Sequence, residues 1–135
     1  MRGRYWSSAG VRFFKLDYEK AMGELREYAQ KALLKGARAV VLIGSLARGD
    51  YTAFSDADVV IVVDEAPDRP QDRVLDFLDP TLTLDVEPRV YTAEELLRMA
   101  REGRRLAEEV VEHGKLLAGD SGLIEAARVL LRRRG

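Results

Sequence analysis

The sequence predicts an α/β domain with a small mixed β-sheet and helices packed mainly on one face. Two short apolar runs, 38–43 and 57–63, are rich in β-branched residues, which is typical of buried strands. A third stretch, 81–87, alternates apolar and polar residues, as a strand with one solvated face does. Apolar residues recur with helical spacing before and after these stretches. Strands interspersed with helices indicate the α/β class.

Composition limits the classes of protein. The 135 residues suit one domain, 1–135, and 47% apolar with 33% charged residues indicates a soluble globular protein. A net charge of −1 excludes a global basic field for nucleic acid, and the absence of cysteine excludes disulfides and thiolate metal sites. No apolar run approaches the ~20 residues of a membrane span, and the N-terminus lacks a signal-peptide apolar region. The expected location is cytoplasmic.

The N-terminal third divides into an arm and a helix. Residues 1–15 are basic and aromatic, and we expect an arm that packs on the domain or on a second subunit. Contact with RNA or a partner is the alternative, since aromatic residues interleaved with arginine stack on bases. Asp17 reads as an N-cap, and apolar spacing from Tyr18 predicts a helix that ends at Gly36.

The middle of the chain reads as two strands around a short connection. After the strand at 38–43, residues 45–49 suit a single helical turn and residues 50–55 a loop. The nearly continuous apolar run at 57–63 predicts a central strand covered on both faces. Apolar residues at 74–78 then predict a short helix that ends before Pro80.

From Thr92 onward, capping and breaking residues mark the expected ends of the helices. Thr92 and Glu95 have the spacing of a capping box, and the helix that follows is interrupted by Gly103. A second segment reaches Gly114, with His113 as a helix-terminal residue, and residues 115–118 suit a short last strand. Ser121 is the expected cap of a C-terminal helix, 121–135, whose final arginines suit the helix dipole.

A candidate site lies at the start of the strand at 57–63. Side chains alternate along a strand, so Asp56 and Asp58 project to the same side, where they repel unless a cation lies between them. Mg²⁺ is commonly held by one or two carboxylates plus substrate phosphates. Upstream, Gly44 lets backbone approach a ligand, Ser45 offers a hydroxyl and an amide, and Arg48 suits an anion or supports the loop. These residues predict a site for a metal-bound nucleoside triphosphate. A capping or turn role for the two aspartates is the alternative.

These residues resemble a known family. Gly44-Ser45, ten further residues and Asp56-x-Asp58 resemble the signature of the DNA polymerase beta-like nucleotidyltransferases. The fuller pattern, with Arg48 in Gly-Ser-x-x-Arg-Gly, is closest to the minimal nucleotidyltransferases (MNT). The resemblance is strong over 40–63, weaker over 85–117, and does not cover the first fifteen residues or the C-terminal helix.

The resemblance implies a nucleotidyltransferase fold and an enzyme that transfers a nucleoside monophosphate from Mg-NTP, first of all ATP, to a hydroxyl with release of pyrophosphate. Asp56 and Asp58 would bind Mg²⁺, and Gly44, Ser45 and Arg48 would hold the triphosphate. The family carries a third aspartate on the next strand, and Asp85 matches that place. Glu87, on the same face, is the rival, whereas Asp64 reads as a loop residue.

The resemblance also implies a partner. Minimal nucleotidyltransferases are often encoded beside a helical HEPN-domain protein, and some are antitoxins that adenylylate this toxin. The expected role is therefore the antitoxin of a toxin–antitoxin pair. The alternatives are a non-catalytic antitoxin-like binding module and nucleotidyl transfer to a small molecule such as an aminoglycoside. The acceptor, the nucleobase preference and any homo-oligomer stay open.

Overall fold

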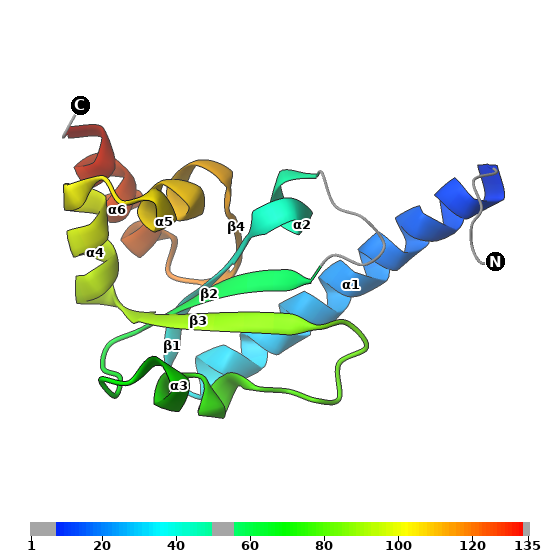
Figure 1. Ribbon diagram of the computed structural model, residues 1–135, viewed down its shortest axis with the longest axis horizontal. Coiled ribbons are helices and arrows are strands. Elements are labelled where there is room, and N and C mark those ends of the chain that lie inside the picture. Colours follow the sequence, from blue (N-terminus) through cyan, green and yellow to red (C-terminus); the bar gives the residue numbers. More distant parts are fainter. Residues whose placement is uncertain (1–7, 50–55, 134–135) are drawn as a thin grey trace.

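The computed structural model describes residues 8–49 and 56–133, with side chains from residue 18 onward. Its strands are β1 (Ala37–Ile43), β2 (Ala57–Val63), β3 (Val86–Thr92) and β4 (Lys115–Gly119) (Figure 1). Its helices are α1 (Ser8–Leu34), α2 (Gly44–Arg48), α3 (Pro70–Arg73), the 3₁₀ turn η1 (Leu75–Phe77), α4 (Ala93–Glu102), α5 (Arg105–Glu108), the π-helical η2 (Glu109–His113) and α6 (Ser121–Arg133). Within these described residues, no helix is both long and apolar enough to cross a membrane.

The four strands form one mixed sheet in the order β3-β2-β1-β4. β1 is antiparallel to both β2 and β4, whereas β2 and β3 run parallel. The prediction of a small mixed sheet is confirmed, and the bounds of β2 agree with the predicted central strand. β1 and β2 lie at the centre of the sheet, so their backbone groups pair on both sides.

Helices cover both faces of the sheet, because alternate residues of β1 and β2 enter two separate cores. On one face, Val40, Leu42, Val59 and Ile61 pack with α1. On the other, a core that includes Val41 and Val60 packs with α4, the α5–η2 segment and α6. The helices are therefore divided between the two faces: α4, α5, η2 and α6 cover one, and α1 runs along the other (Figure 1). Leu46 and Ala47 of α2 and Phe77 of η1 are buried in the same core as α1.

The first helix is longer than the sequence predicts. It begins at Ser8, so the expected start at Tyr18, with Asp17 as N-cap, is wrong, and residues 8–15 of the predicted arm are helical. Adding a residue to an existing helix is easy compared with nucleating one, so the unfavourable aspartate at 17 does not stop it. Residues 1–7 of the arm lie outside the described part of the chain.

The third strand is shifted along the sequence. The expected strand at 81–87 is wrong, because β3 begins at Val86. The preceding residues bond to side chains instead of to a strand: Glu24 of α1 accepts from the Thr83 amide at 3.0 Å and from its hydroxyl at 2.6 Å. Pro88 lies inside β3, where an edge strand tolerates its missing N–H.

After β3, the helix ends follow the predicted local signals with one exception. Thr92 and Glu95 form a complete capping box, and Gly103 ends α4 in the left-handed region. At α6, however, the side chain of Asp120 accepts from the amides of Gly122 and Leu123, at 2.9 and 3.3 Å. Asp120 therefore caps this helix in place of the predicted Ser121, the first helical residue. The helix predicted at 74–78 is replaced by α3 and the short turn η1.

Candidate functional site

The site is built where β1 turns into α2. Ile43 ends β1 opposite Asp58 of β2, and Gly44 turns the chain with a φ of +80°. A Cβ placed on Gly44 would lie 2.7 Å from Oδ2 of Asp58, closer than two such atoms approach. Only glycine combines this backbone conformation with this proximity. The turn therefore brings backbone directly against the Asp58 carboxylate.

Asp58 lies on the sheet face that carries α4, α5 and α6. Its alternating neighbours on β2, Val60 and Val62, are fully buried in the core on that face. Asp58 itself is half-buried, and Asp56, one residue before β2, is exposed. The helices thus cover the far part of β2 on this face and leave Asp58, near the start of the strand, partly open.

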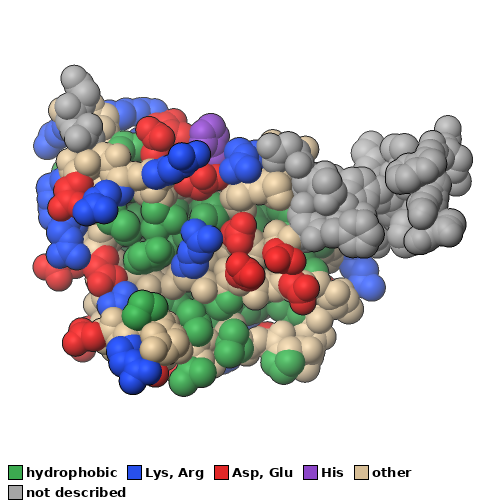
Figure 2. Space-filling model, viewed as in Figure 1, with side chains coloured by type: hydrophobic (Ala, Val, Ile, Leu, Met, Phe, Trp, Pro, Cys, Tyr) green, Lys and Arg blue, Asp and Glu red, His purple; other side chains and the backbone are tan. Residues whose placement is uncertain are grey.

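The next strand adds two carboxylates at the same level. In the parallel register, Glu87 lies opposite Asp58, and neighbouring strands are ~4.8 Å apart. Asp85 lies just before β3, where its carbonyl accepts from the Ala57 amide at 2.8 Å, so it is level with Asp56. Both Asp85 and Glu87 are exposed. Figure 2 shows acidic side chains gathered over this part of the sheet.

The carboxylates are neighbours, but they are not drawn into a closed metal cluster. Within the described residues, no three Asp, Glu, His or Cys side chains converge as metal ligands. The residues nevertheless fit Mg²⁺, because their donors are carboxylate oxygens, and the missing side chain of Gly44 lets the backbone turn lie directly against the Asp58 carboxylate.

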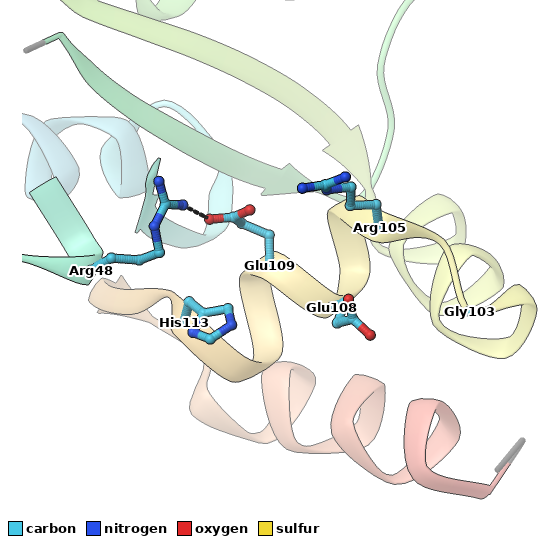
Figure 3. Close-up of a pocket in the computed structure, with 6 residues that line it drawn as sticks. All are labelled: Arg48, Gly103, Arg105, Glu108, Glu109 and His113. Atoms are coloured by element: carbon cyan, nitrogen blue, oxygen red, sulfur yellow. Dashed lines mark hydrogen bonds and ion pairs between the residues drawn. The ribbon is translucent and has the colours of Figure 1, made fainter. Parts of the chain in front are cut away.

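Arg48, at the far end of α2, meets a residue that the sequence did not single out. Its guanidinium donates to the Glu109 carboxylate of η2 at 2.5 Å. The two line a pocket of about 420 Å³ together with Gly103, Arg105, Glu108 and His113 (Figure 3). Glu109 begins the π-helical segment and His113 ends it, and π turns recur at functional sites. α2 thus connects the Asp58 carboxylate at one end with this pocket at the other.

Ser45 begins the short connection between these two places. It is half-buried in α2, and its carbonyl accepts from the Gly49 amide at 2.9 Å, which closes the helical turn that the sequence predicts. The loop predicted at 50–55 lies outside the described residues. His113 ends η2 just before Gly114, which agrees with the predicted helix-terminal place.

A partly buried ion pair holds β3 in position. Arg73 of α3 donates to both carboxylate oxygens of Glu95, at 2.7 and 3.0 Å, and to the Val90 carbonyl of β3 at 3.2 Å. The Arg73 guanidinium lowers the pKa of Glu95 to about 2. Because α3 and α4 are tied to β3 in this way, the strand that carries Glu87 has a fixed place in the sheet.

Comparisons with known proteins agree with this fold. A family model described as "Nucleotidyltransferase domain" matches residues 22–118, from α1 to β4. A solved structure described as "Crystal structure of the toxin-antitoxin with AMP-PNP" has a similar fold, with a TM-score of 0.58 and 23% sequence identity. The similarity covers 81% of this chain and 85% of that one. No curated protein sequence matches the chain.

Proposed function

Since this chain belongs to the nucleotidyltransferase family, we propose that it transfers a nucleoside monophosphate from Mg-ATP to a hydroxyl group. The observation that carries the proposal is the contact between Gly44 and Asp58, because it sets the backbone of a Gly-Ser turn directly against a carboxylate, as a site for metal-bound phosphates requires. Mg²⁺, when bound, neutralises phosphate charge and polarises the transferred group. Its ligands would be Asp56, Asp58 and a carboxylate from the third strand.

Each residue has a distinct role in this proposal. Gly44 and Ser45 bind the triphosphate through their backbone and hydroxyl, and Arg48 supports the triphosphate from the end of α2. For the third carboxylate, the sequence favours Asp85, and Glu87 is the rival because it lies opposite Asp58. Asp85 remains a candidate because it is level with Asp56.

The reaction is a single displacement. The third carboxylate accepts the proton of the acceptor hydroxyl, and the hydroxyl oxygen forms a bond to the α-phosphorus. The bond between this phosphorus and the oxygen that bridges to the β-phosphate breaks, and pyrophosphate leaves with the electron pair. Positioning and charge stabilisation provide most of the rate in such transfers.

The acceptor in this proposal is a protein. The solved structure with a similar fold is described as a toxin–antitoxin with AMP-PNP, which supports both an adenine nucleotide and a protein partner. We propose that the chain is a cytoplasmic antitoxin and that its partner is a helical HEPN toxin that receives the nucleotide.

The test uses ATP labelled on the α-phosphate, Mg²⁺ and the candidate toxin. We expect label on the toxin with the parent protein, and a loss of ~10²–10⁴-fold when the carboxylate that accepts the proton is neutralised. Asp85→Asn and Glu87→Gln identify that carboxylate. Asp64→Asn is the matched control, because Asp64 follows the opposite end of β2 and pairs with Arg38 at 3.2 Å.

Two results would contradict the proposal. Tight toxin binding without any transfer of label, and unchanged by the three substitutions, would make the protein a binding module that acts by occlusion. A loss of transfer in Asp64→Asn equal to that in the other variants would show that general damage, and not the site, explains the result.

A further inference from the structure

One basic side chain lies at the site and has no role in the proposed function so far. Arg89 is the only basic residue in β2 and β3. In the parallel register it lies opposite Val60, two residues beyond the pair formed by Asp58 and Glu87. Val60 is buried on the α4–α6 face of the sheet, and residues paired across parallel strands project to the same face. Arg89 therefore shares the face of Asp58.

The rest of β3 agrees with this orientation. Val86 and Val90 pack into the core beneath α1, whereas Tyr91 packs into the core on the other face. Alternation then places Glu87 and Arg89 with Tyr91. Arg89 is exposed where the helices leave the sheet open, and a basic side chain lies beside the acidic group in Figure 2.

Arg89 has opposite charges nearby and still forms no ion pair or hydrogen bond with the described residues. Other arginines of this structure behave differently: Arg38 binds Asp64 and Asp120, and Arg73 binds both oxygens of Glu95. Two residues along a strand span ~6.6 Å, a distance that an arginine side chain covers. The guanidinium can therefore reach an anion held over Asp58 and Glu87.

The order of the strands indicates which part of the nucleotide it reaches, and this step rests on the proposed function. Gly44 directly follows β1, Asp58 lies on β2 and Arg89 on β3, so Arg89 is on the opposite side of Asp58 from Gly44 and Arg48. If the outer phosphates lie at Gly44 and Ser45, the α-phosphate lies over Asp58. The nearest basic group on its other side is then Arg89.

We propose that Arg89 is a catalytic residue that binds a non-bridging oxygen of the transferred α-phosphoryl group. As the hydroxyl oxygen attacks and pyrophosphate leaves, negative charge on these oxygens is stabilised by a guanidinium already in place. The proton still passes to the third carboxylate. Arg48 interacts with the outer phosphates only.

The experiment measures binding without turnover. Adenosine, AMP and ATP differ only in their phosphates, and AMP carries the α-phosphate alone. Titration calorimetry in Mg²⁺ buffer compares the parent with Arg89→Ala, Arg89→Lys and Arg48→Ala. Arg98→Ala is the control, because Arg98 is an exposed arginine of α4 that does not line the pocket.

We expect Arg89→Ala to weaken AMP and ATP binding by the same factor, about tenfold, as for one charge-assisted hydrogen bond, and to leave adenosine binding unchanged. Arg89→Lys recovers part of the loss. Arg48→Ala weakens ATP binding but leaves AMP binding within about twofold. In the transfer assay, Arg89→Ala lowers kcat by more than it raises KM.

The outcomes separate the two proposals. If the parent binds ATP better than adenosine but Arg89→Ala keeps the parent affinity for AMP, the role of Arg89 is refuted and the proposed function stands. The role of Arg89 is also refuted if Arg89→Ala changes only the affinity for Mg²⁺, since the arginine then acts only by offsetting the negative charge of the carboxylates. If the parent binds AMP and ATP no better than adenosine, the nucleotide site itself is refuted, and the role of Arg89 with it.

Discussion

Replacing Gly44 with alanine tests the contact on which the site depends. The substitution has two separate effects. The φ of +80° forces alanine into the left-handed region, which costs roughly 1–2 kcal/mol. The new Cβ also lies 2.7 Å from Oδ2 of Asp58, whereas Cβ and Cγ of Asp58 are at an ordinary 3.5 Å. Only the carboxylate must therefore move, and a terminal group on a single bond turns at little cost in stability.

The expected result is a modest loss of stability and a large loss of binding. A loss of 1–2 kcal/mol corresponds to a fall in Tm of roughly 3–8 °C for a chain of this size. Because Asp58 is displaced from its place as a metal ligand, we expect Mg-ATP affinity to fall at least about tenfold. Thermal unfolding measures the first effect and titration calorimetry the second.

Gly36→Ala is the matched control. Gly36 has a φ of +109°, and no heavy atom of the described chain lies within 4 Å of a Cβ placed there. It should lose similar stability and keep the parent affinity for Mg-ATP. If Gly44→Ala binds Mg-ATP as tightly as Gly36→Ala, the contact between Gly44 and Asp58 has no part in the site, and the reasoning fails.

Two further predictions concern the elements that support the site. Arg73 depresses the pKa of Glu95 from 4.5 to about 2, so this carboxylate contributes stability above pH 4.5 that is lost as pH falls toward 2. Glu95→Gln should lower the free energy of unfolding at pH 7 by up to about 3 kcal/mol. Urea unfolding at a series of pH values should then show a smaller loss of stability in acid than the parent shows; an unchanged pH dependence would contradict this. Asp120→Ala should lower the free energy of unfolding by about 1 kcal/mol, because Asp120 accepts hydrogen bonds from the first amides of α6, and Ser121→Ala should lower it by less than about 0.5 kcal/mol. If Ser121→Ala is the more destabilising of the two, Ser121 and not Asp120 is the cap.

Local signals account for most of the elements. The β-branched run that forms β2, the capping box at Thr92 and the break at Gly103 depend on residues only a few positions apart, and the structure agrees with them. The start of β3 depends on distant residues. Alternation continues without interruption from 81 to 90, so the pattern does not reveal where pairing begins. Glu24, 59 residues before Thr83, holds that residue outside the sheet.

The candidate site likewise has parts that local sequence predicts and parts that depend on distant residues. The sequence by itself determined the Gly44-Ser45 turn and the Asp56-x-Asp58 pair, because both lie at the facing ends of two strands that are neighbours in the chain. The tertiary structure decided that Glu87 lies opposite Asp58, that Glu109 binds Arg48, and that Arg89 lies on the same face as the carboxylates. The physical reason is that a shift of one residue in strand register reverses the face of every side chain. The register is set by the packing of the whole domain, so the spacing of residues along the sequence does not determine it.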